Sequence, residues 1–178
     1  MHLARPQMGL TATILVILRT IAVALLACGQ QRNSRNIPDG DFTPPVTAVI
    51  AAYNEEKVIG ATLQDLLRSR YPGEIEVIVI DDGSTDRTSE IVSRMAQDDP
   101  RIRLLRQPNR GKAGALIQGV EAASHDLLIM LDADTRFEPD AITHLVRPLR
   151  DPRVAAVSGH ARVGNLRTFI ARCQALEY

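Results

Sequence analysis

The sequence has little cysteine, no surplus of either charge and no histidines spaced for metal binding. Its two cysteines, Cys28 and Cys173, lie far apart and outside any CxxC pattern, which argues against a disulfide framework or a zinc site. Lysine plus arginine equals aspartate plus glutamate at 21 each, so the basic surplus needed to bind a phosphate backbone is missing. The four histidines show no ligand spacing. We therefore expect no nucleic-acid partner and no metal site built from cysteine or histidine.

Several common catalytic and nucleotide-binding motifs are also missing. There is no GxxxxGK followed by Ser or Thr, and no GxGxxG follows the first predicted strand, so neither a P-loop nor a dinucleotide fingerprint is predicted. Ser158 lies in VSGHA and not in GxSxG, which removes the main indication of a serine hydrolase.

The N-terminal part contains an apolar run at residues 9–29, about long enough to cross the hydrocarbon core of a bilayer. Arg19 interrupts it, at a cost of about 2.5 to 3.5 kcal/mol that the surrounding aliphatic residues offset. We predict a membrane helix, with Arg32 and Arg35 favouring a cytoplasmic location for the C-terminal side of the chain. The alternative is a lipoprotein signal peptide, since the four residues ending at Cys28 resemble its cleavage site.

The length of 178 residues allows one globular domain and a short extra segment. We divide the chain into the hydrophobic segment 1–29, a polar, proline-containing linker 30–45, and a domain at 46–178.

The predicted domain alternates strands and helices. Continuous β-rich apolar runs at residues 46–52, 75–80 and 127–131 predict strands buried on both faces of a parallel sheet. Helical periodicity lies between them, a short strand is expected at 102–105, a helix at 112–123, and a later strand at 154–163. This alternation indicates an α/β, doubly wound architecture.

Acidic clusters follow three of the predicted strands, where ligands bind in open parallel sheets. Because the carboxyl ends of parallel strands meet at one edge, we expect five carboxylates to share that edge: Glu55, Asp81, Asp82, Asp132 and Asp134. Crowded carboxylates repel one another, so they need a cation or hydrogen-bond donors. The pattern predicts a metal site.

Asp132 and Asp134 are separated by one residue where a strand ends, so both can approach one ligand. A small set of oxygen ligands suits Mg²⁺ or Mn²⁺, with diphosphate and water completing the coordination. The plainer interpretation is a turn in which aspartate bonds its own backbone.

The other clusters are similarly open to two interpretations. In DDGSTD, Ser84 or Thr85 could cap a helix that Asp86 also favours, or one of the doubled acids could accept the N–H of a uracil-like base. Glu55 suits either a first helical turn or a ribose contact. In NRGKAGAL, Lys112 begins a helix after a glycine-rich entry, so it suits either a solvated position or an ion pair or diphosphate contact.

Taken in order, AAYNEE, VIDDGSTD, NRGKAGAL and MLDADT resemble the motifs of family 2 glycosyltransferases over residues 45–178. The resemblance is greatest to membrane-bound processive members of the poly-N-acetylglucosamine, hyaluronan and chitin synthase types. It implies a GT-A fold and an inverting, metal-dependent transfer of a hexose or N-acetylhexosamine, from a UDP-sugar, to a glycan or lipid acceptor in polysaccharide biosynthesis at the plasma membrane. The implied nucleotide-sugar-binding residues are Ala51, Tyr53, Glu55, Asp82, Lys112 and Asp132, and the implied ligands of Mg²⁺ or Mn²⁺ are Asp132 and Asp134.

The family pattern also implies parts that this sequence does not show. The general base is expected beyond residue 178, and the family's Gln-x-x-Arg-Trp motif is absent because the chain has no tryptophan. Two alternatives therefore stay open: a nucleotide-sugar-binding module without catalysis, and a sugar nucleotidyltransferase. The second is disfavoured because acidic AAYNEE stands where a basic phosphate loop would be expected.

Overall fold

The structure is a computed structural model that describes residues 42–159. Within this range no helix is long and apolar enough to cross a membrane. The predicted membrane helix at residues 9–29 and most of the predicted linker lie outside the described residues.

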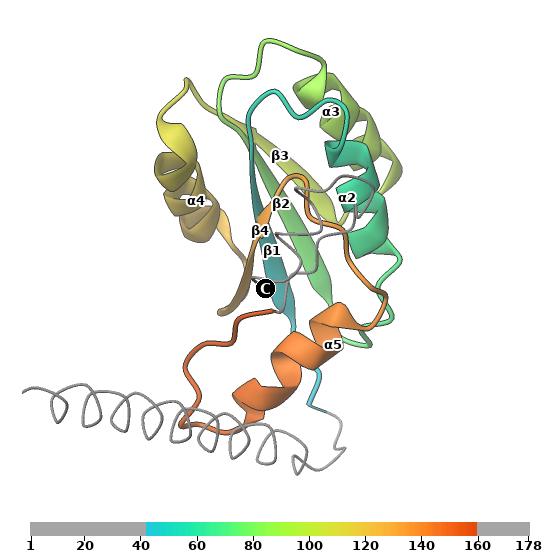
Figure 1. Cartoon of the computed structure of the whole chain (residues 1–178), viewed down its shortest axis with the longest axis vertical. Coiled ribbons are helices and arrows are strands. Elements are labelled where there is room, and N and C mark those ends of the chain that lie inside the picture. The colour runs from blue at the N-terminus through green and yellow to red at the C-terminus, as the bar shows by residue number, and fades with distance from the viewer. Residues whose placement is uncertain (1–41, 160–178) are drawn as a thin grey trace, which may run out of the picture. The chain divides into compact units, whose positions relative to one another are not determined.

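Within residues 42–159, four parallel strands form one sheet in the order β3-β2-β1-β4, with helices in the connections (Figure 1). The predicted α/β class is thereby confirmed. The strands are β1 (Val46–Ala52), β2 (Ile75–Asp81), β3 (Ile102–Arg106) and β4 (Leu127–Asp132). The helices are α2 (Ile59–Leu67), α3 (Thr88–Asp98), α4 (Gly111–Ala122) and α5 (Ala141–Val146), which runs into a 3-10 turn, η1 (Arg147–Arg150).

The two central strands explain the apolar runs in the sequence. β2 is buried at all seven positions and β1 at six of its seven, because each has a strand on both sides and helices on both faces. β4 is an edge strand among the described residues, and only Ile129 and Leu131 are buried on it. Met130 is 57% exposed, so the prediction that this run is buried on both faces is wrong.

The helices cover both faces of the sheet because the chain reverses its direction across it. The connections through α2 and α3 step outward from β1 to β3, whereas the connection through α4 returns past β1 to β4. With right-handed crossovers, opposite directions place the helices on opposite faces. Figure 1 shows α2 and α3 on one side of the strands and α4 on the other.

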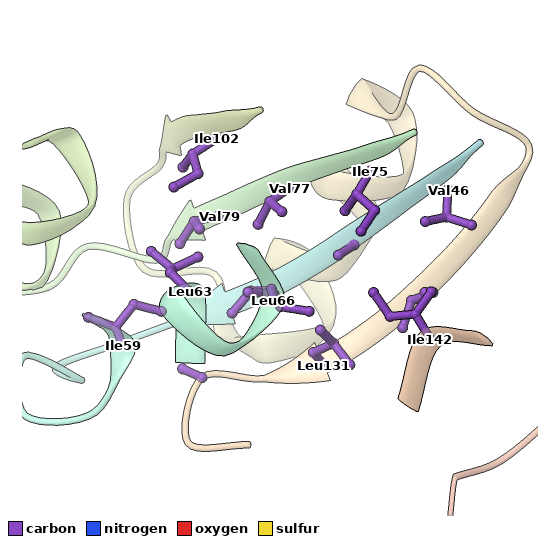
Figure 2. Close-up of a cluster of buried hydrophobic side chains, with 14 of the residues drawn as sticks. Val46, Ile59, Leu63, Leu66, Ile75, Val77, Val79, Ile102, Leu131 and Ile142 are labelled. Carbon is purple, nitrogen blue, oxygen red and sulfur yellow. The ribbon is translucent and has the colours of Figure 1, made fainter. Parts of the chain in front are cut away.

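Two hydrophobic clusters fix these layers. The larger packs α2 and α5 against the sheet through residues such as Leu63, Leu66 and Ile142 (Figure 2). The smaller joins α4 to the other face, where Ala115 meets Val49 and Ile80. Burial of this kind contributes about 1.5 to 3 kcal/mol for each large aliphatic side chain.

The strand order reverses between β1 and β4, which makes the carboxyl ends of these two strands the topological switch point of the sheet. There, Ala51 of β1 lies opposite Asp132 of β4, and Ala52 lies opposite Asp81 of β2. Three of the motifs found in the sequence therefore meet at one edge.

One predicted element is not formed where it was expected. Residues 154–159 contain no strand, and most of them are exposed, while residues 160–163 lie outside the described range. The run VAAVSG is apolar enough for a strand, but β-propensity is realised only where neighbouring strands and a covered face are available.

Candidate functional site

A pocket of about 260 Å³ lies at the carboxyl ends of β1 and β4. Its position is the switch point, where ligands of open α/β sheets bind. All seven residues predicted from the sequence to bind nucleotide sugar or metal line it, together with Ala52 and Ala133. The predicted residues are Ala51, Tyr53, Glu55, Asp82, Lys112, Asp132 and Asp134.

The segment after β1 is held by hydrogen bonds to the segment after β2. Asn54, which has a positive φ of 57°, accepts the backbone N–H of Thr85 at 2.8 Å and donates its own N–H to Ser84 Oγ at 3.0 Å. The N–H of Glu55 donates to Thr88 Oγ1 at 2.8 Å. Tyr53, which is 48% exposed, is thereby carried on a fixed segment at the pocket.

The structure shows which of these residues bonds the start of α3 and where Glu55 lies relative to α2. Ser84 and Thr85 bond Asn54, and it is Asp86 that accepts the N–H of Thr88 at the start of α3, at 2.9 Å. Glu55 lies before α2, which begins at Ile59, and its carbonyl oxygen accepts the N–H of Ile59 at 3.0 Å.

Asp82 is a buried carboxylate in the wall of the pocket, only 3% exposed. Its Oδ1 accepts Gln107 Nε2 at 2.6 Å and the backbone N–H of Arg110 at 2.8 Å. Burial alone would raise the pKa of Asp82, but these donors favour the charged form and hold the pKa below its ordinary value. The carboxylate is therefore ionised at neutral pH, with Oδ2 left outside both bonds.

Gln107 is a contributor that the sequence analysis missed. It is buried, its N–H donates to the carbonyl of Asp81, and its amide holds Asp82. A glutamine at the end of a short strand carries no local pattern that would single it out. It joins the DDGSTD segment to the segment leading into α4.

The expectation of five clustered carboxylates is wrong for Asp81. This residue accepts the N–H of Ser84 at 2.9 Å and lines a separate hollow of about 710 Å³ beside α3. Successive strand residues point to opposite faces, so Asp81 and Asp82 diverge. The larger hollow has three arginines balanced by three acids and none of the predicted binding residues, so the smaller pocket is the better candidate.

The charge of the smaller pocket is strongly unbalanced. Four carboxylates, Glu55, Asp82, Asp132 and Asp134, face a single ammonium, that of Lys112. Lys112, the second residue of α4, forms an ion pair with Asp132, and both side chains are more than half exposed. An anionic nucleotide would enter such a pocket only with a cation to compensate.

Asp132 and Asp134 fit the requirements of a hard divalent cation. They flank Ala133 on a turn closed by the Thr135 N–H, which donates to the carbonyl of Asp132 at 3.1 Å. Within residues 42–159 no three His, Cys, Asp or Glu side chains gather closely enough to hold a metal. Two carboxylates are nevertheless sufficient for Mg²⁺ or Mn²⁺ when phosphate oxygens and water supply the other ligands.

The sequence of this chain matches a known protein family. The family model described as Glycosyl transferase family 2 matches residues 47–173. This chain belongs to glycosyltransferase family 2. It is 37% identical over 134 residues to poly-beta-1,6-N-acetyl-D-glucosamine synthase of Staphylococcus aureus, and 34% identical to the synthase of Staphylococcus epidermidis. Each match covers 75% of this chain and 32% of the synthase, so the chain spans about a third of these relatives.

Solved structures of this type have the same architecture. The mannosyltransferase PcManGT of Pyrobaculum calidifontis, in complex with GDP-Man and Mn²⁺, is 30% identical with a TM-score of 0.65, covering 84% of this chain and 46% of its own. TarS of Staphylococcus aureus, in complex with UDP-GlcNAc, is 20% identical with a TM-score of 0.54, covering 67% of this chain and 38% of its own. The second likeness concerns the fold alone.

Proposed function

We propose that the pocket at the β1–β4 switch point binds a nucleotide-sugar donor and a divalent cation for an inverting glycosyl transfer. The observation that carries this proposal is the composition of the pocket, in which four carboxylates and one lysine from four separate segments meet at the switch point. Membership in glycosyltransferase family 2 supports it.

The nucleoside part of the donor is assigned to the β1 side of the pocket. Tyr53 offers an exposed aromatic ring, and Ala51 and Glu55 also line the pocket. Asp82 is ionised and pre-oriented, so its Oδ2 can accept an N–H from a base such as uracil. A buried carboxylate already held by two donors loses little freedom when it binds.

The diphosphate part is assigned to the β4 side. Lys112 at the start of α4 can donate to phosphate oxygens, and Asp132 and Asp134 would hold the cation, with Asp132 also within reach of the ribose in this assignment. A bound Mg²⁺ or Mn²⁺ supplies compensation for the charge of the departing nucleoside diphosphate.

The donor is proposed to be a UDP-linked hexose or N-acetylhexosamine, and the acceptor a growing glycan or a lipid. The relatives with 34 to 37% identity are named as poly-N-acetylglucosamine synthases, which supports an N-acetylhexosamine. The general base for the acceptor hydroxyl is assigned to no described residue. We further propose that residues 1–29 anchor the domain to the plasma membrane through the linker 30–45, with residues 46–178 on the cytoplasmic side.

A second candidate is a module that binds the nucleotide sugar without transferring it. It would use the same pocket residues and would differ from the first candidate only in turnover. A sugar nucleotidyltransferase is a weaker candidate, because the segment after β1 is acidic and supplies no basic phosphate loop.

The function can be tested by titrating the purified full chain with UDP, UDP-N-acetylglucosamine and GDP-mannose in the presence of Mn²⁺. The proposal predicts saturable binding with a preference for the uridine nucleotides. UDP released from UDP-N-acetylglucosamine in the presence of chitooligosaccharides would indicate transfer, and binding without release would indicate the module. Pyrophosphate formed from UTP and N-acetylglucosamine 1-phosphate would indicate a nucleotidyltransferase. A folded chain that binds none of the three nucleotides would contradict the proposal.

A further inference from the structure

A hydrogen bond from helix α2 holds the turn that carries Asp132 and Asp134. Thr62, fully buried on α2, donates its hydroxyl to the carbonyl oxygen of Ala133 at 2.7 Å. Ala133 is itself buried, at 5% exposure, and lies between Asp132 and Asp134. The bond joins residues 71 positions apart in the sequence.

A second contact from the same helix holds the chain just after the turn. Asp65, one helical turn beyond Thr62, accepts the guanidinium of Arg136 at 2.5 Å and the backbone N–H of Phe137 at 3.4 Å. Phe137 also packs against the larger hydrophobic cluster. The segment from Ala133 to Phe137 is therefore attached to α2 at both ends, and Asp134 lies between the two attachments.

We propose that Thr62 is a positioning residue that sets the orientation of Asp134, and through it the affinity of the donor site for its cation. This inference rests on the proposed function of the pocket. The physical link is the peptide plane between Ala133 and Asp134. The Ala133 carbonyl is one end of that plane and the Asp134 N–H is the other, so a hydroxyl that fixes the carbonyl also fixes the backbone that bears Asp134.

The alternative role for the hydroxyl is only to satisfy a buried carbonyl. In that case its loss would destabilise the domain without changing how the pocket binds its ligands. The positioning role predicts a change in cation affinity, because groups that orient metal ligands typically alter affinity by about 10- to 100-fold when removed. The two roles are therefore separable by measurement.

Thr62→Val removes the hydroxyl at nearly constant volume, and Thr62→Ser keeps it. The matched control is Thr47→Val. Thr47 is also fully buried and donates a hydroxyl bond of 2.7 Å, but to Glu76, at the opposite end of the sheet. Thr62→Ala provides a second hydroxyl-free variant. For each full-length variant, Mn²⁺ affinity is measured by electron paramagnetic resonance at saturating UDP, UDP affinity without metal by calorimetry, and stability by thermal melting.

We expect Thr62→Val to weaken Mn²⁺ binding by about 10-fold or more, with UDP affinity in the absence of metal little changed. Thr62→Ser should restore Mn²⁺ affinity, and Thr47→Val should leave it unchanged. Equal Mn²⁺ affinity in Thr62→Val and wild type would overturn the inference while leaving the proposed function intact. If neither hydroxyl-free variant folds, the hydroxyl serves stability and the inference is also overturned. If the wild-type chain binds neither UDP nor Mn²⁺, the proposed function itself fails, and the inference fails with it.

Discussion

Glu76, which lies far from the pocket near the start of β2, is one carboxylate through which acid is expected to destabilise this domain. Its oxygens accept Thr47 Oγ1 at 2.7 Å, and the backbone N–H and hydroxyl of Ser124 at 2.9 and 2.8 Å. Arg103 adds an ion pair. The bonds join β1, β2, β3 and the segment after α4, so the whole network depends on the ionised form of one side chain.

The size of the effect can be worked out from the pKa of Glu76. Burial would raise this pKa, but the Ser124 N–H and the Thr47 and Arg103 donors outweigh it and lower the pKa from 4.5 to about 2. At about 1.4 kcal/mol per unit, the lowered pKa corresponds to about 3 kcal/mol of stability. Because the folded-state pKa is lowered, this stability is fully present above the unfolded-state value and is lost as the pH falls from about 4.5 toward 2. About 2 kcal/mol should be gone by pH 3.

Urea unfolding of the full chain and of Glu76→Gln, from pH 6 to pH 3, measures this contribution. Other carboxylates titrate in both proteins, so the relevant quantity is the difference in the free energy of unfolding between them. That difference should shrink by about 2 kcal/mol over this range, because the glutamine cannot be protonated. A difference that stays constant from pH 6 to pH 3 would refute the assigned network. Direct titration of the Glu76 carboxyl by carbon-detected NMR in the wild-type chain provides the same test without a substitution.

The remaining predictions concern packing and the pocket cation. Gly119→Ala should destabilise the domain by about 1 kcal/mol or more in urea unfolding, because the new methyl would lie 2.3 Å from Val49 Cγ1 and 2.6 Å from Ile80 Cδ1. The control is Gly60→Ala on α2, where the nearest atom to the new methyl would be 3.6 Å away, so the free energy of unfolding should stay the same or rise. If Gly119→Ala were as stable as wild type, α4 would not pack this closely on the sheet. Lys112→Gln should weaken UDP binding without metal by about 10-fold, since a charge-assisted bond to phosphate contributes about 1.5 kcal/mol or more. The melting temperature should change little, because the Lys112–Asp132 pair is largely exposed; unchanged UDP affinity would remove Lys112 from the site.

The positions of the strand ends could be predicted from the sequence, because an apolar run followed by acidic residues is a local pattern. The runs VTAVIAA and IEVIVI are buried strands followed by acids. The rule that ligands bind at the carboxyl ends of parallel strands correctly grouped residues from separate segments into one pocket. The alternation of strand residues could also have separated Asp81 from Asp82, since adjacent positions face opposite sides. Grouping all five acids overlooked that rule.

Other features depend on contacts that no local pattern encodes. The hydroxyl bond from Thr62 to Ala133 and the amide bond from Gln107 to Asp82 join elements that meet only after the sheet has formed. The exposure of Met130 results from the place of β4 in the strand order, which the run LLIML does not reveal. The absence of a strand at residues 154–159 shows the same dependence on neighbouring strands.

The proposed binding of a nucleotide sugar through a divalent cation held at Asp134 can be measured on the purified chain. It is tested most directly by calorimetric titration of the full chain with UDP, with and without Mn²⁺, in wild type, Asp134→Asn and the control Asp98→Asn, an exposed acid at the end of α3. We expect Mn²⁺ to strengthen UDP binding in wild type and in Asp98→Asn. We expect Asp134→Asn to lose this enhancement while keeping its metal-free affinity. An equal enhancement by Mn²⁺ in Asp134→Asn and in wild type would contradict the proposal.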